Sequence, residues 1–381
     1  MATYKEQNKL NVPHLRFPEF HGEWEEHGLS EYLDFKNGLN PDSKRFGKGI
    51  KFISVMDILN NPVITYDCIR ASVQATDAEM SSFSVENGDI LFQRSSETLE
   101  DVGRANVYID DKVAVFGGFV IRGKKKANYN PLFFRYLLSS PYARKRIIPM
   151  GAGAQHFNIG QEGLSKVLLN FPSIEEQTKI ASLLHLLDER IATQSKLIEK
   201  LESLIKGIVQ KIVRNNKPNV RLAECLECKS STLQESEVCE QGTYPVYGAN
   251  GIVGYLDNYS TEGEAVYIIK DGSGVGTVSY VTGKCSATGT LNTLQAKEGY
   301  SLQYFYYLLK VFNFEPYKTG MAIPHIYFKD YGKAKVFCPS YTEQLQYARL
   351  LSAIESNLSI EINIQTNLSL QKQYLLRQMF I

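Results

Sequence analysis

The chain has 381 residues, of which 43% are hydrophobic and 22% charged, and its formal net charge is +1 at pH 7. This length is enough for two or three domains, and the small net charge excludes a global basic field, so any surface for nucleic acid has to be local. Six cysteines in a chain of this length are typical of reduced thiols. Residues 1–10 lack an apolar signal segment, and no apolar run approaches the roughly 18 residues of a membrane span. We therefore expect a cytoplasmic protein with no membrane partner.

Residues 1–172 have the mixed pattern of an α+β domain, with an N-terminal arm over residues 1–28. Short runs rich in β-branched and aromatic residues predict strands, because Gly, Asn and Asp bound them. A second mixed segment over residues 215–339 repeats this pattern. The predicted strands are Lys51–Val55, Asp89–Phe92, Val113–Phe116, Ala265–Ile269 and Thr277–Val281, and the predicted short helices are Pro131–Leu138 and Leu302–Val311.

A long helix is predicted after each mixed segment, over residues 173–214 and residues 340–381. In the first, apolar residues alternate at spacings of four and three for more than four heptads, which is typical of a coiled coil. The second stripe is interrupted at Glu361 and Gln365, and Gln194 lies in the middle of the first. A polar seam residue either fixes the helix register or is a tolerated surface residue. The residues predicted to form this spacer and partner-binding seam are Leu184, Leu187, Ile191, Ile198, Leu201, Leu351, Ile354, Leu358 and Leu368.

About 40 helical residues span roughly 60 Å, which is more than a domain of this size can cover. Each long helix therefore needs an equally long partner, and the other helix is the obvious one. Because a mixed domain lies between them in the sequence, the two helices most simply run antiparallel. The predicted fold is α+β, with two pseudo-repeated domains joined by two long helices that form an antiparallel coiled coil.

The two halves of the chain repeat one another. Three stretches recur in the same order, whereas between the first two pairs the halves diverge almost completely. A repeated frame around divergent segments indicates one fold that carries two different surfaces. The matched pairs are LSEYLDFKNG at residues 29–38 with LAECLECKSS at residues 222–231, LFFRYLL at residues 132–138 with QYFYYLL at residues 303–309, and FPSIEEQTKIASLLHLLDERIA at residues 171–192 with CPSYTEQLQYARLLSAIESNLS at residues 338–359.

Convincing motifs of catalysis are missing from the sequence. It has no glycine-rich phosphate loop, no histidine pattern of a metal site, and no nucleophile with a general base at a telling spacing. Cys225 and Cys228 form one CxxC, but tetrahedral zinc needs four ligands, so we expect no metal. The sequence therefore predicts a binding protein, with an enzyme as an alternative.

Basic residues concentrate in the first domain. Residues 113–161 contain eight Lys or Arg residues and no Asp or Glu, and residues 37–51 form a second, glycine-rich basic segment. Gathered on one face, such residues would bind phosphates, whereas the plain alternative is a solvated face. Arg, Gln and Asn near turns could also read base edges. The predicted DNA-binding residues are Lys44, Arg45, Lys48, Gln93, Arg94, Arg104, Lys124, Lys125, Lys126, Tyr247, Asn250, Lys270, Lys284 and Lys318.

The predicted geometry also suits double-stranded DNA. Two similar domains at the ends of an antiparallel helix pair are related by an approximate two-fold axis, and duplex DNA has the same pseudo-symmetry. Readers of one DNA face place their half-sites about 34 Å apart, and helices on the order of 60 Å long can hold two readers at that separation.

Several stretches together resemble the specificity subunit of Type I restriction-modification enzymes. They are PHLRFPEFHGEWEEHGLSEYLDFKNG at residues 13–38, NGDILFQRSSETLEDVGRANVY at residues 87–108, FGGFVIRG at residues 116–123, YPVYGANGIVGY at residues 244–255, GMAIPHIYFKDY at residues 320–331, and the starts of both long helices. The resemblance implies two target-recognition domains that each read one half of a bipartite DNA sequence. It also implies helices that act as a spacer and dock two methyltransferase subunits, with restriction subunits in the full complex. The chain itself would be non-catalytic, and S-adenosylmethionine, ATP and Mg would belong to the partners.

One departure from the family pattern concerns the lead-in RFPEFHGEW at residues 16–24, which has no counterpart in the second half. The arm Leu15–Trp24 therefore either packs against one repeat or completes the frame of the second. The rival hypothesis for the whole chain is a cytosolic coiled-coil scaffold that binds proteins and has no DNA recognition.

Overall fold

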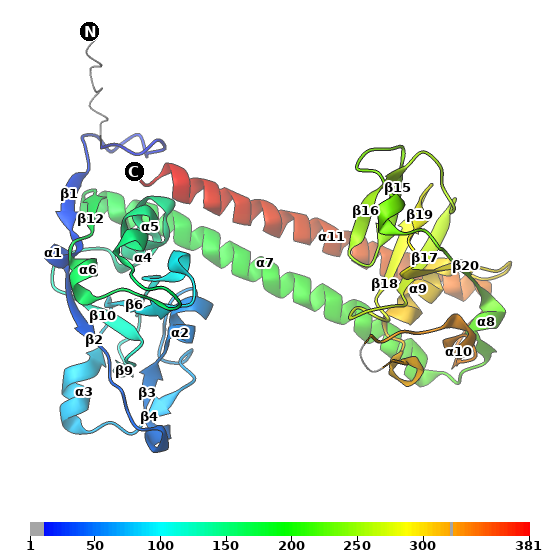
Figure 1. The fold of residues 1–381 in the computed structure, drawn as a ribbon, viewed down its shortest axis with the longest axis horizontal. Helices are drawn as coiled ribbons and strands as arrows, with labels where there is room; N and C mark the ends of the chain where they lie inside the picture. The colour runs from blue at the N-terminus through cyan, green and yellow to red at the C-terminus, as the bar shows by residue number, and fades with distance from the viewer. Residues whose placement is uncertain (1–10, 321–322) are drawn as a thin grey trace, which may run out of the picture. The chain divides into compact units, whose positions relative to one another are not determined.

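The chain divides into two compact units (Figure 1). The computed structural model describes residues 11–320 and 323–381. Unit 1 comprises residues 1–194 and 365–381, and unit 2 comprises residues 195–364. Residues 1–10 of the predicted arm and residues 321–322 of the stretch 320–331 lie outside the described residues.

Unit 1 is built on a four-stranded antiparallel sheet of order β2-β10-β6-β8, with a smaller sheet of order β4-β3-β9-β5. Its elements are β1 (Glu25–Gly28), α1 (Leu29–Tyr32), β2 (Leu33–Asn37), η1 (Ser43–Arg45), β3 (Phe46–Ile53), α2 (Val55–Asn60), β4 (Ser72–Val73), α3 (Asp77–Phe83), β5 (Ser84–Val85), β6 (Ile90–Gln93), β7 (Ser95–Ser96), η2 (Leu99–Asp101), β8 (Ala105–Val107), β9 (Ala114–Phe116), β10 (Val120–Lys125), α4 (Pro131–Ser139), α5 (Pro141–Ile147), η3 (Ile148–Met150), β11 (Phe157–Asn158), α6 (Gln161–Ser165), β12 (Leu168–Phe171) and the first half of α7 (Ile174–Asn215).

Unit 2 repeats this frame with a sheet of order β14-β20-β17-β18, and its smaller sheet has the order β16-β15-β19. Its elements are the second half of α7, β13 (Val220–Arg221), α8 (Leu222–Cys225), β14 (Leu226–Ser230), η4 (Glu235–Glu237), β15 (Tyr244–Gly248), β16 (Gly251–Leu256), β17 (Glu264–Ile269), β18 (Val278–Thr282), β19 (Ser286–Ala287), β20 (Leu291–Ala296), α9 (Leu302–Lys310), η5 (Glu315–Tyr317), α10 (Phe328–Tyr331), β21 (Lys335–Val336) and most of α11 (Tyr341–Gln378).

The inner strands β6 and β17 of the two central sheets form from residues that are almost all buried. All of β6 is buried, which explains why Ile90–Gln93 reads as a short, nearly continuous apolar run. The helix above it, α4, begins where Asn130 Oδ1 accepts the N–H of Phe133 at 3.0 Å, with Pro131 in its first turn. In unit 2, Ser301 caps α9 in the same way. The predicted repeat is therefore confirmed at the level of sheet order and helix caps.

Each unit contains an antiparallel pair of helix segments. In unit 1 the start of α7 packs with the end of α11, and in unit 2 the end of α7 packs with the start of α11, where Ile205 and Val209 share a core with Leu351. The two long helices are continuous over 42 and 38 residues. This pairing confirms the predicted antiparallel coiled coil.

A glutamine joins each long helix to its domain. Gln177 Oε1 accepts the backbone N–H of Asn130 at 3.1 Å, and Gln177 Nε2 donates to the carbonyl of Pro172 at 3.0 Å. In unit 2, Gln344 makes the same two bonds, at 2.9 Å from Ser301 N and at 2.9 Å to Pro339 O. Both glutamines are nearly buried, at 3% and 2% exposure, so these bonds are shielded from water.

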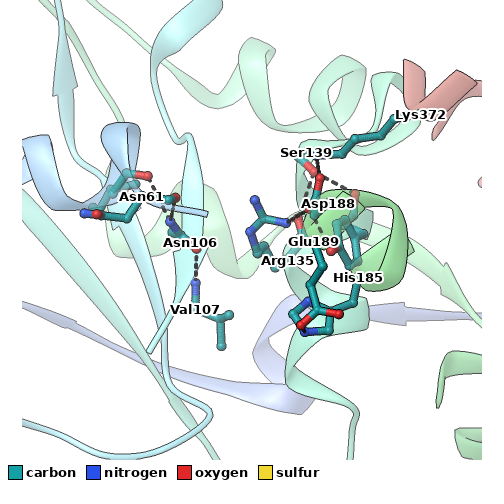
Figure 2. Close-up of polar contacts among 11 residues, drawn as sticks. Asn61, Asn106, Val107, Arg135, Ser139, His185, Asp188, Glu189 and Lys372 are labelled. Carbon is teal, nitrogen blue, oxygen red and sulfur yellow. Dashed lines mark hydrogen bonds and ion pairs between the residues drawn. The ribbon is translucent and has the colours of Figure 1, made fainter. Parts of the chain in front are cut away.

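A carboxylate about three turns further along each helix reinforces the join. Asp188 on α7 accepts from Tyr136 at 2.8 Å and from Arg135 at 3.3 Å, and it pairs with Lys372 of α11 (Figure 2). In unit 2, Glu355 takes this place. Its acceptor oxygens receive hydrogen bonds from Tyr306 and Tyr307 at 2.8 Å and from Lys310 at 2.9 Å.

The described part of the N-terminal arm packs on unit 1. Arg16 donates to Glu176 of α7 at 2.8 and 2.7 Å, and Trp24, at 2% exposure, contacts the rings of Phe133 and Phe380. Since Phe380 lies just after α11, the arm covers the place where both ends of the chain meet unit 1. The arm thus contacts both repeats, because Glu176 and Phe133 belong to the first and Phe380 follows the long helix of the second.

One predicted strand ends too late in the sequence. The sequence predicted a strand over Lys51–Val55, but β3 ends at Ile53 and α2 begins at Val55. The reason is the side chain of Asp57, which accepts from both the backbone N–H and the hydroxyl of Ser54 at 2.7 Å. This capping arrangement satisfies donors at the helix start and stops the strand.

Candidate nucleic-acid interface

One edge of the central sheet in unit 1 gathers several predicted DNA-binding residues. Because β10 and β6 are antiparallel, the end of β6 lies beside the start of β10. Arg94 donates its backbone N–H to the carbonyl of Phe119 at 2.9 Å, and Gln93 donates its own to the carbonyl of Arg104 at 2.7 Å. Three residues that are far apart in sequence, Arg94, Arg104 and Phe119, thus share one edge.

The same edge in unit 2 has the same main-chain bonds. Lys270 donates its N–H to the carbonyl of Thr290 at 3.0 Å, and Ile269 donates to the carbonyl of Thr277 at 3.0 Å. One more main-chain hydrogen bond is the same in both units. The carbonyl of Arg94 accepts the N–H of Ile159 at 2.9 Å, and the carbonyl of Lys270 accepts the N–H of Ile326 at 2.9 Å. Arg94 and Lys270 are therefore structurally equivalent.

We call these two clusters the strand-end sites. The first consists of Arg94, Arg104 and Phe119, and the second of Lys270, Thr277 and Thr290. Both keep a cation at the end of the central strand, while the other two positions differ in chemical type. Phe119 and the threonines were not among the predicted residues, although aligning residues 89–94 with residues 265–270 would have indicated this edge.

Side-chain exposure separates the predicted residues at the first strand-end site. The side chain of Arg104 is 54% exposed and pairs with Asp101 at 2.5 Å. Arg94 is half-buried and donates to the carbonyl of Gly118 at 3.3 Å. Gln93 is only 5% exposed, and its Nε2 donates to the carbonyl of Ser95 at 2.9 Å. Gln93 is consequently the least available of the three to an external ligand.

The glycine-rich basic segment forms η1 and the start of β3. Lys44 and Lys48 are exposed, but Arg45 is committed to the fold, because it pairs with Glu79 and donates to the carbonyl of Gln74. The Arg45 guanidinium, followed by the N–H of Thr76, lowers the pKa of Glu79 to about 2. Two cations of this segment therefore remain available for phosphates.

Lys124, Lys125 and Lys126 lie at the other end of β10 from Phe119. Lys124 pairs with Glu86 at 2.9 Å, and Lys125 donates to the carbonyl of Tyr129 at 3.1 Å. Lys126 is exposed, and within the described part of the chain its ammonium makes no hydrogen bond or ion pair.

The acid-free segment 113–161 does not form the single basic face that its sequence suggested. Arg122 is buried and donates to the carbonyl of Ser84, and Arg135 and Arg144 have partners inside unit 1. The reason is that carboxylates and carbonyls from outside the segment fold against it.

The remaining predicted residues of unit 2 differ in setting. Tyr247 adjoins the second strand-end site, since its carbonyl accepts from Thr288 at 2.9 Å. Asn250 is exposed in the turn between β15 and β16. Lys284 lies 3.6 Å from Glu262 and Lys318 lies 2.6 Å from Glu315, so these two cations are already paired.

A cavity of about 450 Å³ also opens beside Arg104. It is lined by three arginines, and each has a partner in the chain: Arg104 pairs with Asp101, Arg135 bonds to Asp188 (Figure 2), and Arg144 donates to two carbonyls. Burial, followed by repulsion from Arg104, lowers the pKa of Arg144 to about 10. These internal contacts make the cavity a weaker phosphate site than the exposed lysines.

The predicted seam residues lie along the helix pairing in each unit. Their burial between the helices suits a spacer. A partner protein would instead have to bind the apolar residues that stay exposed on the same helices. Leu184, Leu187, Ile198, Leu351 and Leu368 are buried, and Ile191, Leu201, Ile354 and Leu358 are half-buried.

The described residues offer neither a helix that could span a membrane nor a cluster that could hold a metal ion. Among the helices that the structure describes, none is both long and apolar enough to span a membrane. Within residues 11–320 and 323–381, no group of three or more His, Cys, Asp or Glu side chains could hold a metal ion.

Known proteins were compared with the sequence and with the fold. Curated relatives include the Type I restriction enzyme EcoprrI specificity subunit of Escherichia coli, 27% identical over 117 residues, which are 31% of this chain and 29% of the relative. Another is the putative type I restriction enzyme MjaX specificity subunit of Methanocaldococcus jannaschii, 24% identical over 217 residues, which are 56% of this chain and 50% of the relative. The chain thus spans half or less of the length of these relatives.

Solved structures share the whole fold. The S subunit of a Type-I restriction-modification system from M. genitalium has a TM-score of 0.67 at 18% identity and covers 97% of this chain and 99% of its own. A chain from a structure of complex assembly in the type I R-M system has a TM-score of 0.53 at 14% identity, covering 93% and 96%. The family described as the Type I restriction modification DNA specificity domain matches twice, at residues 21–203 and 216–370. The chain therefore belongs to the specificity subunits of Type I restriction-modification systems.

Proposed function

We propose that this chain is the non-catalytic subunit that selects the DNA target of a Type I restriction-modification complex, and that each domain reads one half of a bipartite sequence. The observation that carries this proposal is the pair of strand-end sites. Their main-chain bonds are the same, yet Arg104 and Phe119 in one correspond to Thr277 and Thr290 in the other. One frame with two sets of side chains is what two readers of unlike half-sites require.

The surrounding cations support a division of labour within each domain. Exposed lysines such as Lys44, Lys48 and Lys126 would neutralise phosphates and position the domain, because such contacts carry no sequence information. Arg94 and Lys270, at the strand ends, would reach base edges or the adjoining phosphates. We propose residues 1–172 and 215–339 as the two target-recognition domains and residues 173–214 and 340–381 as the spacer helices.

The helices would also dock two methyltransferase subunits, to which restriction subunits add in the full cytoplasmic complex. Leu370 and Tyr374 are one turn apart on α11, and Leu197 and Leu204 two turns apart on α7, so each pair shares a helix face, and exposed apolar residues that gather in this way mark surfaces for other proteins. S-adenosylmethionine, ATP and Mg would be bound by these partners. Such exposed residues are Leu186, Leu370 and Tyr374 in unit 1 and Leu197, Leu204, Leu350 and Ile360 in unit 2.

Mapping methylated bases in the genome of cells with and without the chain tests the proposal. We expect one bipartite motif to lose its methylation when the chain is absent. Exchanging residues 220–319 for those of a relative should then change one half of the motif and leave the other unchanged. A change in both halves would contradict the modular reading.

A second measurement separates the proposal from a scaffold without DNA recognition. The complex of the chain with its methyltransferase subunits is titrated with the mapped target duplex and with a scrambled duplex at several salt concentrations. A DNA reader binds the target more tightly and loses affinity as salt rises. Equal binding to both duplexes would support the scaffold.

A further inference from the structure

An apolar cavity of about 470 Å³ lies beside the first strand-end site. Of the described residues that line it, none is charged. Three of its large apolar side chains are exposed to solvent, Phe119 at 68%, Met56 at 61% and Phe46 at 42%. Exposed apolar residues gathered around one hollow indicate a contact with another molecule, because scattered single residues need no explanation but a cluster does.

The chain is built to present Phe119 outward. Gly117 and Gly118 precede it in the turn between β9 and β10, where Val120 donates its N–H to the carbonyl of Gly117 at 2.8 Å. A Cβ atom at Gly118 would lie 1.8 Å from Asn40 Oδ1, and one at Gly117 would lie 2.6 Å from the ring of Phe52. A larger residue at either position would force Asn40 or the ring of Phe52 to shift, so the two glycines suit the close turn that presents the phenylalanine.

The charge around the cavity points to DNA as the occupant. Exposed Lys44 and Lys48 flank Phe46 in the chain, and the backbone of Arg94 bonds to the carbonyl of Phe119. An apolar centre with cations at its margin matches a duplex, which presents phosphates along its backbone and an apolar methyl group on thymine in the major groove. An apolar protein surface would offer no negative charge to pair with the cations.

We propose that Phe119, with Phe46 and Met56, contacts thymine methyl groups in the half-site read by the first domain. Asn40 lies at the margin of the same cavity, is exposed, and makes no side-chain hydrogen bond within the described part of the chain. Asparagine binds the N6 and N7 edge of adenine, so Asn40 is placed to read the adenine that pairs with such a thymine. This inference rests on the proposed function.

The second domain lacks this apolar reader. Thr290 stands where Phe119 stands in the first, and its Oγ1 lies 2.8 Å from that of Thr288. The contact made by Phe119 belongs to the first half-site, so the Phe119→Ala substitution should change the methyl effect there and leave the second half-site as an internal control in the same complex.

Replacing thymine by deoxyuridine removes the methyl group and keeps base pairing. The complex of the chain with its methyltransferase subunits is titrated with the mapped target duplex, in which each thymine of both half-sites is replaced in turn. We expect at least one replacement in the first half-site to weaken binding about fourfold, since one buried methyl group is worth about 0.8 kcal/mol. In Phe119→Ala, thymine and deoxyuridine should bind equally at that position.

Val113→Ala is the matched control. Val113 is an apolar residue that is 47% exposed and immediately precedes β9, so this variant should keep the full deoxyuridine effect. The inference is overturned if no replacement in the first half-site weakens binding, or if the effect persists in Phe119→Ala. Loss of methyltransferase binding by Phe119→Ala with an unchanged deoxyuridine effect would assign the cavity to that partner instead. Failure of the proposed function looks different, since wild-type complex would then not distinguish target from scrambled duplex.

Discussion

Asn130 and Gln177 are joined by a hydrogen bond of 3.1 Å from the backbone N–H of Asn130 to Gln177 Oε1. The bond connects the cap of α4 to the first turn of α7 and is almost fully shielded from water. Gln344 repeats it with Ser301 at 2.9 Å. One buried amide thus helps to hold each domain on its helix, and removal of that amide leaves main-chain groups without these partners.

Gln177→Ala and Gln344→Ala should each lower the free energy of unfolding by about 1–3 kcal/mol, the cost of leaving buried polar groups unsatisfied. Urea unfolding monitored by circular dichroism measures the loss. Gln346→Ala, at an exposed position of α11, is the matched control and should change stability by less than about 0.5 kcal/mol. Equal effects of the buried and exposed substitutions would show that the join contributes nothing.

Glu355 predicts a pH dependence of stability. Burial would raise the pKa of its carboxyl group, but hydrogen bonds from Lys310, Tyr307 and Tyr306 outweigh burial and lower it. A carboxylate whose pKa is lowered by folding stabilises the protein above the ordinary glutamate range, near pH 4.3, and loses this contribution as the pH falls through the lowered pKa.

Glu355→Gln should therefore destabilise the protein by about 1–3 kcal/mol at pH 7 and by progressively less below pH 4.3. Unfolding titrations at several pH values measure the difference from wild type. Glu199→Gln, at an exposed position on α7, provides the control. A gap between wild type and Glu355→Gln that stays constant down to acidic pH would rule out this role for the carboxylate.

The equivalence of Arg94 and Lys270 predicts separate effects on the two half-sites. Arg94→Ala should weaken target binding by about 1–3 kcal/mol, but only when the first half-site is intact, and Lys270→Ala should do the same for the second. Competition binding with duplexes in which one half-site is scrambled separates the two. Lys196→Ala, at an exposed position of α7, should have no such dependence. If Arg94→Ala weakens binding of both scrambled duplexes equally, then Arg94 makes a general phosphate contact and does not read a base.

The lysines at the far end of β10 predict a change in salt dependence. Each phosphate contact contributes about 0.9 to the slope of log affinity against log salt. Because Lys124 and Lys125 have partners in the chain, replacing Lys124, Lys125 and Lys126 together by Ala should reduce the slope by about 0.9, the share of Lys126 alone. A reduction of the slope about three times as large would mean that DNA displaces the internal partners of Lys124 and Lys125. An unchanged slope would show that this segment does not contact DNA.

The fold was largely predictable because its signals are periodic. The apolar seam of Leu184 and Leu187 predicted a paired helix, and recurrence of the same helix start at residues 338–359 predicted the repeat. The end of β3 was predicted wrongly because the capping bonds of Ser54 with Asp57 depend on two polar residues and leave the apolar pattern unchanged.

The binding residues were harder to predict because sequence charge says nothing about partners. In the sequence, Arg45 and Lys124 look the same as their exposed neighbours Lys44 and Lys126. In the structure, Arg45 pairs with Glu79 and Lys124 pairs with Glu86. Phe119 was missed because a single phenylalanine in a strand-rich region suggests a core residue. Only the register of β6 with β10 shows that it lies at the same edge as Arg94.

The glutamine joins have a consequence for inheritance. The domain-side partners of Gln177 and Gln344 are the main-chain N–H groups of Asn130 and Ser301, while their other bonds go to Pro172, Pro339 and the Cys338 sulfur beside the helix start. Main-chain atoms are supplied by any sequence, so a recombination event that replaces a domain with an unrelated variant leaves the attachment to the helix intact. If the domains read DNA as we propose, new target sequences would then arise by exchange of gene segments, without a matching mutation in the helices.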